Sequence, residues 1–250
     1  MIIIPARLKS TRFPSKVLAQ IRGIPMIVRT AELAKTIDDV IVACDDSLIA
    51  EVCTRYGVRS ILTSNTHESG TDRIAECARI LKLDKKEIII NLQGDEPFLE
   101  QEVILRLKTL MEKEAKKRGA IPFMGSCAKP ITKEEANDPN LVKVVLNAKN
   151  EAIYFSRSLI PYDRENLIQH NEQYLGHLGI YAFSGESLQA FCNLPKSTLE
   201  SIEKLEQLRA LEHSKTIVMA KVESQSFGID TKEDLERALK MFGKRLSTSS

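Results

Sequence analysis

Over residues 1–120, short apolar runs alternate with stretches in which apolar side chains recur every three or four positions. The apolar runs, rich in isoleucine and valine, lie at residues 2–4, 40–44 and 87–92, and a further short strand is predicted at residues 58–62. Such runs predict strands buried on both faces of a parallel sheet. The stretches with helical spacing lie between them, at residues 25–34, 47–56, 71–81 and 100–117. This alternation predicts an α/β fold with a doubly wound, mostly parallel sheet.

After residue 120 the pattern changes to strand-forming runs with turn-rich links between them. Residues 141–146 and 151–155 are joined by Asn147-Ala148-Lys149-Asn150, which predicts an antiparallel ribbon. Later segments predict strands at residues 175–183 and 216–222, and helices at residues 186–193, 202–211 and 231–242. We expect one domain over residues 1–250, with an antiparallel insertion near residues 128–185 and a disordered tail at residues 247–250.

The predicted ribbon carries apolar side chains on both of its faces. They belong to Val142, Val144, Val145, Leu146, Ile153 and Phe155. A sheet that meets water on one side needs only one apolar face, so the second face requires a cover. Either another part of this chain provides that cover or a second copy does, and closed two-fold dimers are the commonest solution. We expect a homodimer with this ribbon at its centre.

Composition and charge argue against several classes of partner. Charged residues make up 28% of the 250 residues, yet the net charge is only +2, so a general nucleic-acid binder is not expected. No apolar run approaches the roughly 18 residues of a membrane span, and the chain opens on a core strand rather than a signal peptide. The cysteines are odd in number and lack C-x-x-C spacing, which predicts neither disulfides nor a zinc site. We expect a cytoplasmic protein that makes no membrane contact.

A dense group of cations directly follows the first strand. The cations are Arg7, Lys9, Arg12 and Lys16. Pro5 is expected to end the strand and no helix is predicted before Pro25, which leaves the cations on a loop at the carboxyl end of a central strand, where open α/β sheets bind ligands. With the hydroxyls of Ser10 and Thr11, this loop suits a polyanion such as the phosphates of a nucleotide. The alternative is a solvated basic surface loop, which has no need to follow a buried strand so abruptly.

Two aspartates occupy comparable places elsewhere in the chain. Asp95 follows a buried strand and Gly94, where an aspartate is often only a helix cap. Beside a polyphosphate site it suits a Mg²⁺ ligand, because this ion takes few carboxylates and completes its shell with phosphate oxygens. Asp230 has a similar setting, although Thr231 and Asp234 form a T-x-x-D capping box that would also explain an acidic residue at this point.

Several phrases resemble the sugar cytidylyltransferases, in particular the 3-deoxy-manno-octulosonate (Kdo) cytidylyltransferase family, also called CMP-Kdo synthetases. The phrases are PARLKSTRFPSK at residues 5–16, HESGTDRIAE at 67–76, NLQGDEP at 91–97 and GIDTKEDL at 228–235. They stand in the family's order, and the match extends from Ile3 to Leu239. This chain has Ser15 where the family usually has glycine, which alters the freedom of the backbone at that turn. The resemblance implies a Rossmann-like nucleotidyltransferase fold with a smaller antiparallel dimerisation ribbon.

The resemblance implies a CTP site built from three of these phrases. The implied nucleotide-binding residues are Pro5, Ala6, Arg7, Ser10, Arg12, Lys16, Ser69, Gly70, Arg73, Gln93 and Gly94. Taken alone, Ser69 and Gly70 are only a helix-start signal. The expected catalytic residues are Arg7 and Lys16, which would neutralise the triphosphate, and Asp95 and Asp230, which would hold Mg²⁺. No residue is identified as a general base.

A sugar site is implied by phrases that resemble the Kdo enzymes rather than nucleotidyltransferases at large. They are YFSR at residues 154–157, HLGIY at 177–181, LESIE at 199–203 and LEQLR at 205–209. The implied sugar-binding residues are Gln93, Arg157, His177, Tyr181, Glu206 and Gln207. Arg157 suits the carboxylate of the sugar, and the last four suit its hydroxyls. Individually they have simpler interpretations, with His177 as a satisfied core histidine and Glu206 and Gln207 as a helix surface.

The expected reaction is transfer of CMP from CTP to the 2-hydroxyl of Kdo, which gives CMP-Kdo and pyrophosphate for lipopolysaccharide synthesis. Catalysis of this kind depends chiefly on positioning and charge stabilisation. The alternatives are a cytidylyltransferase for another acidic sugar, such as amino-Kdo or sialic acid, and an inactive nucleotide-binding homologue. Residues 162–173 are polar and poor in core residues, which makes them the best candidate for a mobile loop. Within them, residues 164–173 resemble the family least and are the stretch expected to tune substrate preference.

Overall fold

The computed structural model describes residues 1–10, 12–168 and 174–243. The chain divides into two compact units. The first contains Met1–Leu83, Asn91–Gln101 and the described residues from Gln225 onward, and the second contains Asp84–Ile90 and Glu102–Ser224. The expected tail at residues 247–250 lies outside the described residues, as do residues 169–173 of the proposed loop.

Parallel strands form the centre of the first unit. The strands β1 (Ile2–Ala6), β4 (Val40–Cys44) and β5 (Ser60–Leu62) lie in the order β1-β4-β5. Every residue of β1 and β4 is buried, as their apolar runs predict. Pro5 does not end β1, because it pairs with Ala43 and the strand continues through Ala6. A proline this close to the end of a strand removes only one ladder hydrogen bond, so the expected stop was wrong by one residue.

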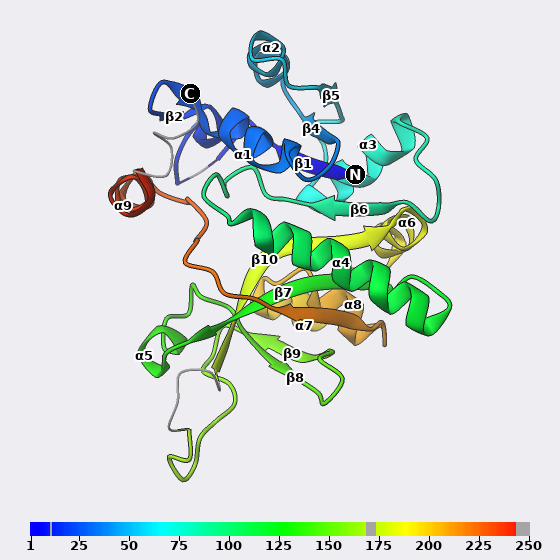
Figure 1. Cartoon of the computed structure of the whole chain (residues 1–250), viewed down its shortest axis with the longest axis vertical. Helices are drawn as coiled ribbons and strands as arrows, with labels where there is room; N and C mark the ends of the chain where they lie inside the picture. The colour runs from blue at the N-terminus through cyan, green and yellow to red at the C-terminus, as the bar shows by residue number, and fades with distance from the viewer. Residues whose placement is uncertain (11, 169–173, 244–250) are drawn as a thin grey trace. The chain divides into compact units, whose positions relative to one another are not determined.

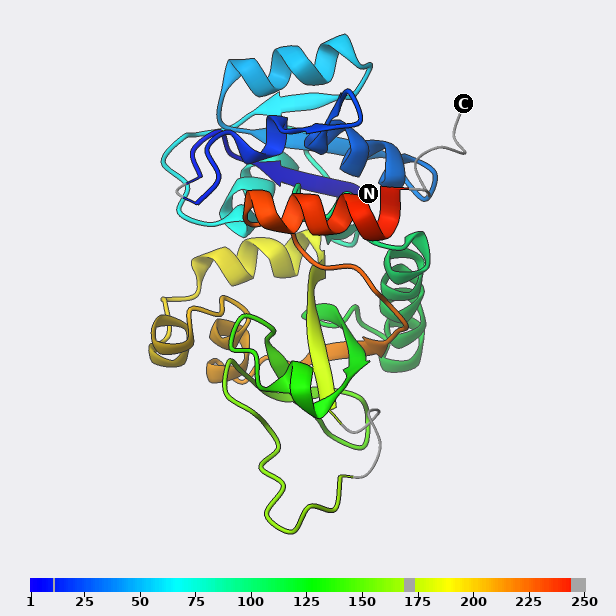
Figure 2. The same ribbon diagram turned by 90° about the vertical axis from the view of Figure 1, so that its left-hand side faces the viewer.

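Three of the four helices described in the first unit begin with a side-chain cap, and α1 (Met26–Lys35), which follows Pro25, does not. The other three are α2 (Ser47–Arg55), α3 (Gly70–Ile80) and α9 (Lys232–Phe242). The Asp46 side chain caps α2, and the Ser69 side chain caps α3. At α9, Thr231 and Asp234 form the predicted capping box. This helix, red in Figure 2, packs through Ala238 and Phe242 against an apolar cluster.

The segment between the basic loop and α1 contains structure that the sequence pattern did not predict. A 3-10 turn, η1 (Lys16–Leu18), is followed by a small hairpin of β2 (Gln20–Ile21) and β3 (Ile24–Pro25). Gly23 adopts a φ of 78° at the turn of this hairpin, a left-handed conformation that glycine takes without steric cost. Ser15 lies at the turn before η1 with a φ of 53°, so this serine adopts a conformation that favours the family's usual glycine.

A mixed sheet forms the centre of the second unit (Figure 1). The strands β6 (Ile88–Asn91), β10 (Tyr174–Ser184), β7 (Met124–Ile131) and β11 (Ile217–Lys221) are neighbours in that order. The pair of β10 and β7 is antiparallel, whereas β11 is parallel to β7. Together with the parallel strands of the first unit, this arrangement confirms an α/β fold with a mixed sheet.

The helices of the second unit are α4 (Gln101–Arg118), whose first residue belongs to the first unit, α5 (Lys133–Ala136), α6 (Gly185–Asn193), α7 (Thr198–Glu203) and α8 (Leu208–Glu212). The expected single helix at residues 202–211 was wrong. A capping box of Ser197 and Glu200 starts α7 earlier, and the left-handed Lys204, with a φ of 56°, ends it before α8 begins. No helix in the described part of the chain is long and apolar enough to cross a membrane.

The predicted ribbon is confirmed as β8 (Lys143–Leu146) and β9 (Ala152–Ser156), which pair antiparallel. Val144 and Phe155 pair across the ribbon and are both buried within this chain. The register passes from Val145 to Leu146 by skipping Ile153, whose side chain remains 56% exposed. The chain therefore covers one apolar side of the ribbon and leaves Ile153 on its surface.

Candidate active site

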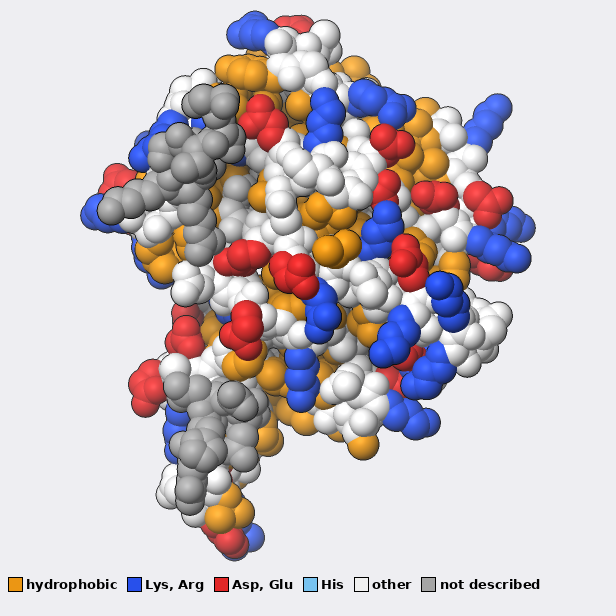
Figure 3. Space-filling model, viewed as in Figure 1, with side chains coloured by type: hydrophobic (Ala, Val, Ile, Leu, Met, Phe, Trp, Pro, Cys, Tyr) orange, Lys and Arg blue, Asp and Glu red, His pale blue; other side chains and the backbone are white. Residues whose placement is uncertain are grey.

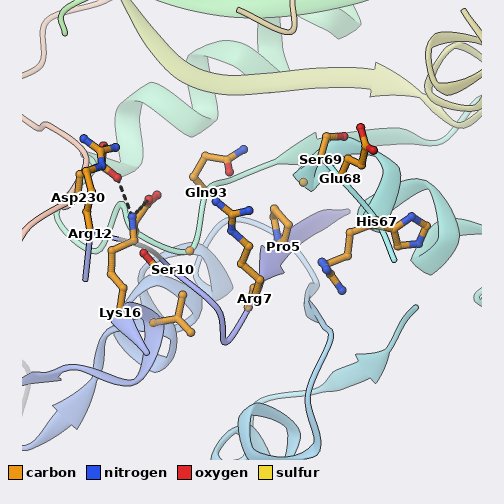
Figure 4. Close-up of a pocket in the computed structure, with 16 residues that line it drawn as sticks. Pro5, Arg7, Ser10, Arg12, Lys16, His67, Glu68, Ser69, Gln93 and Asp230 are labelled. Atoms are coloured by element: carbon orange, nitrogen blue, oxygen red, sulfur yellow. Dashed lines mark hydrogen bonds and ion pairs between the residues drawn. The ribbon is translucent and has the colours of Figure 1, made fainter. Parts of the chain in front are cut away.

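A cavity of about 260 Å³ opens in the first unit at the carboxyl end of β1. All eleven residues expected to bind the nucleotide line it, together with Asp95 and Asp230. The end of β1 with the basic loop, the start of α3, the segment after β6 and the segment before α9 supply these residues. Figure 4 shows Arg7 extending from the end of β1 into this cavity. Residues from four separate stretches of the sequence thus converge on one polar site.

The floor of the cavity requires close approach between backbone segments. A Cβ added to Gly94 would lie 3.1 Å from the Pro5 carbonyl oxygen and 3.1 Å from the Ile27 side chain. A Cβ on Gly70 would lie 3.1 Å from the Pro5 ring. All three distances are tighter than ordinary van der Waals contact. Glycine at positions 70 and 94 therefore lets α3 and the segment after β6 approach β1 closely.

Lys16 links the two predicted metal ligands. Its ammonium Nζ lies 2.6 Å from Asp95 Oδ2 and 2.8 Å from Asp230 Oδ1 (Figure 4). The Arg12 guanidinium lies 2.7 Å from the other oxygen of Asp230. The site therefore holds two carboxylates and two cations in one ion-paired cluster.

These contacts shift the ionisation of the cluster. Burial by itself would lower the pKa of Lys16, but the charges and hydrogen bonds of Asp95 and Asp230 outweigh it and raise that pKa. For Asp230, burial acts to raise the pKa, and the opposing contacts with Lys16 and Arg12 bring it below the usual value. Both pKa shifts favour the charged forms, the ammonium of Lys16 and the carboxylate of Asp230.

The chain holds Asp230 in place through its neighbours. Asp234 Oδ2 accepts hydrogen bonds from the backbone nitrogens of Asp230, at 3.2 Å, and Thr231, at 3.0 Å. The backbone nitrogen of Ile229 donates to the Asp95 carbonyl at 3.0 Å, which ties the two carboxylate-bearing segments together. Thr231 caps α9 while the Asp230 side chain contacts Lys16, so the cap does not account for Asp230.

The donor set of Asp95 and Asp230 fits a divalent cation. Their carboxylate oxygens converge on one positive charge, the Lys16 ammonium, at hydrogen-bonding distance. Mg²⁺ characteristically uses one or two carboxylates and takes its remaining ligands from substrate phosphates and water. Among the described residues no group of three or more His, Cys, Asp or Glu side chains is placed to hold a metal.

Ser69 and Arg73 have structural partners as well as a place in the cavity wall. The Ser69 hydroxyl accepts the backbone nitrogen of Asp72 at the start of α3. Arg73 is buried, and its guanidinium donates to Thr63 Oγ1 at 2.7 Å and to the Ser64 carbonyl at 3.2 Å. The helix-start interpretation of Ser69 therefore holds together with its position in the wall.

Three further residues line the cavity that the sequence argument did not single out: Val17, His67 and Glu68. His67 hydrogen-bonds to Glu76, which also accepts the backbone nitrogen of Ser64 at 2.8 Å. His67 and Glu68 belong to the same sequence phrase as Ser69 and Gly70. The phrase at residues 67–76 thus contains two further cavity-lining residues, which its helix-start pattern does not mark.

Of the residues expected to bind the sugar, Gln93 belongs to the first unit and the other five to the second. His177 is buried and its Nε2 lies 2.9 Å from Ser126 Oγ, so it is a satisfied core histidine in this structure. Burial lowers the pKa of His177 to about 3, which keeps its ring neutral.

Tyr181 and Gln207 lie next to this histidine. The His177 and Tyr181 rings are 5.5 Å apart, and the Tyr181 hydroxyl donates to Gln207 Oε1 at 3.2 Å. Gln207 is buried and lies, like the partly buried Glu206, between α7 and α8, so the helix-surface interpretation of Gln207 was wrong. Within the described residues its amide Nε2 has no hydrogen-bond partner.

Arg157 is anchored at the end of β9. Its backbone nitrogen donates to Glu203 Oε2 at 2.9 Å, and its Nε donates to the Glu203 carbonyl at 2.8 Å. One terminal guanidinium nitrogen donates to the Pro139 carbonyl at 3.1 Å. Lys143, which is fully buried, donates to the Arg157 carbonyl at 2.6 Å. The protein thus fixes both the backbone and the side chain of Arg157.

Comparisons with known proteins identify relatives across nearly the whole chain. A cytidylyltransferase family model matches residues 1–217. A 3-deoxy-manno-octulosonate cytidylyltransferase of Wolinella succinogenes is 58% identical over 97% of this chain and 99% of its own length. Another of that name from Helicobacter pylori is 54% identical over 98% of this chain and 99% of its own.

Solved structures give a consistent picture. A CMP:2-keto-3-deoxy-manno-octonic acid synthetase in complex with CTP superimposes with a TM-score of 0.87 at 37% identity, covering 98% of both chains. A cytidylyltransferase from Leptospira borgpetersenii superimposes with a TM-score of 0.62 at 16% identity, covering 97% of this chain and 86% of the other. The second likeness supports only the fold, because its sequence identity is low.

Proposed function

The chain belongs to the 3-deoxy-manno-octulosonate cytidylyltransferase family, and we propose that it transfers CMP from CTP to the 2-hydroxyl of Kdo, with release of pyrophosphate. The product would serve lipopolysaccharide synthesis. The observation that carries this proposal is the convergence of all eleven expected nucleotide-binding residues on one cavity. A CTP-bound structure among its relatives supports the same substrate.

In the proposed reaction, the 2-hydroxyl of the sugar attacks the α-phosphorus of CTP in line with the leaving pyrophosphate. Arg7 extends into the cavity, where it would bind the triphosphate and orient it for this displacement. Lys16 and Arg12 also line the cavity, and each now pairs with a carboxylate. When CTP binds, phosphate oxygens would replace these carboxylates as their partners. The basic loop would thus orient the triphosphate of CTP and neutralise its charge.

We propose Mg²⁺ as the cofactor, held by Asp95 and Asp230. When bound, the ion would neutralise charge on the triphosphate and favour ionisation of the attacking hydroxyl. The convergence of both carboxylates on one ammonium supports the choice of these residues. The ion would require Lys16 to give up at least one of its two carboxylate contacts.

The sugar would contact Gln93, Arg157, His177, Tyr181, Glu206 and Gln207. The buried network of His177, Tyr181 and Gln207 supports a role in hydrogen bonding, because the Gln207 amide nitrogen is buried without a partner among the described residues and so favours a polar ligand. His177 would act as a neutral hydrogen-bonding group rather than as a cation. Arg157 would offer its remaining guanidinium donors to the sugar carboxylate.

A pyrophosphate-release assay tests the proposal. The purified chain is incubated with Mg²⁺, one nucleoside triphosphate and one acidic sugar from a panel of Kdo, amino-Kdo and sialic acid. We expect release with CTP and Kdo, and little with ATP or with sialic acid. Preference for another sugar would reassign the substrate, and silence with every sugar, despite CTP binding, would indicate an inactive homologue.

We propose that the protein acts as a homodimer through the ribbon of β8 and β9. The exposed Ile153 and the partly exposed Val145 and Tyr154 support a second apolar cover for this ribbon. Val144, in contrast, is buried within the chain, and its replacement would test folding rather than assembly. Light scattering should give a dimer mass for the wild type and for Leu48→Glu on the exposed side of α2, and a monomer mass for Ile153→Glu. A wild-type monomer at micromolar concentration with full activity would overturn the proposal.

We propose a cytoplasmic location. Cys44, Cys53, Cys77 and Cys127 are free thiols buried within the chain. Burial raises the pKa of the Cys44 thiol to about 11, which keeps it protonated and unreactive. Such thiols are characteristic of proteins in a reducing compartment.

A further inference from the structure

Asp45 connects the basic loop to the parallel sheet. It directly follows β4, and its Oδ1 accepts the backbone nitrogen of Leu8 at 2.9 Å. The β1–β4 ladder ends at the pair Ala6 and Cys44, so this contact adds one more link beyond the last backbone pair. Leu8 follows Arg7, so its backbone nitrogen is part of the peptide bond that joins these two residues just beyond the end of β1. The Asp45 contact therefore fixes the chain where Arg7 enters the cavity.

A carboxylate so close to a triphosphate site requires compensation. Its Oδ2 lies 3.4 Å from the Arg73 guanidinium, and the two side chains are only 14% and 4% exposed. Arg73 is held in turn by Thr63, whose hydroxyl donates to the Cys44 carbonyl at 2.9 Å. Arg73 thus offsets the charge of Asp45 where a free carboxylate would repel phosphate.

The adjacent aspartate, Asp46, has a different hydrogen-bond partner. The Asp46 side chain accepts the backbone nitrogen of Leu48 at 2.9 Å and caps α2. The two neighbours share a residue type and a strand end, but among the hydrogen bonds of the described residues it is that of Asp45 that reaches the basic loop.

We propose that Asp45 is a positioning residue for nucleotide binding, because it sets the course of the loop that carries Arg7 and so the placement of that guanidinium against the triphosphate. Asp45 itself would not touch the substrate. This inference rests on the proposed function for its kinetic consequences, whereas its structural part concerns the loop alone.

The kinetic test compares Asp45→Ala and Asp45→Asn with Asp46→Ala. Removing the acceptor for the partly buried Leu8 amide should raise KM for CTP about tenfold to a hundredfold in Asp45→Ala, with KM for Kdo unchanged. Asp45→Asn keeps an oxygen acceptor and should recover part of the loss. Asp46→Ala should lose a helix cap and show a lower unfolding midpoint, with its KM for CTP within twofold of wild type. Equal CTP constants for Asp45→Ala and Asp46→Ala would overturn the inference.

Limited trypsin digestion provides a readout that needs no turnover. Arg7 and Lys9 are exposed on the loop, so cleavage after them reports its anchoring. Without nucleotide, Asp45→Ala should be cut there severalfold faster than wild type and Asp46→Ala. Equal cutting rates would refute the loop anchor even in an active enzyme. If the wild type failed to turn over CTP and Kdo but the digestion difference appeared, only the proposed function would fall.

Discussion

Replacing Lys16 by methionine removes the positive charge at the centre of the ion cluster while keeping an unbranched apolar stem. The Lys16 side chain is 12% exposed, and its ammonium contacts carboxylates that are 27% and 45% exposed, those of Asp95 and Asp230. Because both carboxylates reach solvent, and Arg12 still pairs with Asp230, we expect a stability change of only about 1 kcal/mol. The effect on turnover should be much larger.

The kinetic magnitude follows from the place of Lys16 beside the triphosphate site. Loss of one preorganised group that stabilises transition-state charge typically reduces turnover by about 10² to 10³. We expect a loss of this size in kcat for Lys16→Met, measured by pyrophosphate release at saturating CTP and Kdo. Lys9→Met is the matched control, because Lys9 is exposed on the same loop and does not line the cavity that contains Lys16. It should retain turnover within about threefold of wild type.

Divalent-cation binding gives an independent measure of the same variant. In the wild type, Lys16 occupies both carboxylates that we assign to Mg²⁺. Without nucleotide, Mn²⁺ titrated under electron paramagnetic resonance should therefore bind Lys16→Met more tightly than wild type. Equal losses of turnover in Lys16→Met and Lys9→Met would refute the assignment, because only the total charge of the loop would then matter. Weaker Mn²⁺ binding by Lys16→Met would refute the competition between ammonium and metal.

Asp95→Asn and Asp230→Asn should each abolish measurable turnover while circular dichroism stays native, and near-normal rates at limiting Mg²⁺ would remove that residue from the metal site. The His177 pKa is lowered on folding, so the unfolded state binds more protons between pH 6.5 and about 3, and stability should fall with decreasing pH in that window. This contribution of His177 to the pH dependence of the free energy of unfolding is about 1.4 kcal/mol per pH unit at most, and His177→Gln should lack it. Urea unfolding of both proteins at pH 7 and pH 5 measures the difference, and identical pH dependence would contradict a buried neutral histidine. Glu200→Gln should reduce the free energy of unfolding by about 3–5 kcal/mol, because it leaves Arg209 buried opposite a neutral side chain, and a loss below 1 kcal/mol would show that the pair is solvated.

The parts of the fold that could be predicted are those where one local pattern decides the outcome. The isoleucine run of β1 can be buried only on both faces, and the cations after it must then lie at a strand end. The capping box of Thr231 and Asp234 likewise gives the start of α9. In both cases the determining residues are neighbours in sequence.

The elements that were missed depend on tertiary contacts. The strand β7 contains small and polar residues and Pro130, so no strand pattern marks it, although it pairs with both β10 and β11. The break between α7 and α8 falls at Lys204 in a stretch that reads as continuous helix. Its left-handed backbone has no sequence signal, because lysine rarely adopts it.

In the site, too, local sequence predicts the individual residues but not the contacts between residues far apart in the sequence. The sequence predicted Lys16 as a phosphate ligand and Asp95 as a metal ligand, and the family resemblance implied Asp230 as a second metal ligand. The structure pairs Lys16 with both aspartates, which lie 79 and 214 positions away in the sequence. Ion pairing over such separations depends on how the strand ends meet, which no local pattern specifies. The same holds for Asp45 and the loop backbone at Leu8, 37 positions apart.

The most direct test of the proposed reaction is the ³¹P nuclear magnetic resonance spectrum of CTP, Kdo and Mg²⁺ incubated with the purified chain. The account predicts that the three CTP signals are replaced by one phosphodiester signal of a sugar-linked CMP and by pyrophosphate in equal molar amount. It also predicts that this conversion disappears in Asp95→Asn. Persistence of the CTP signals, or their replacement by CDP and inorganic phosphate, would contradict attack by the sugar at the α-phosphorus.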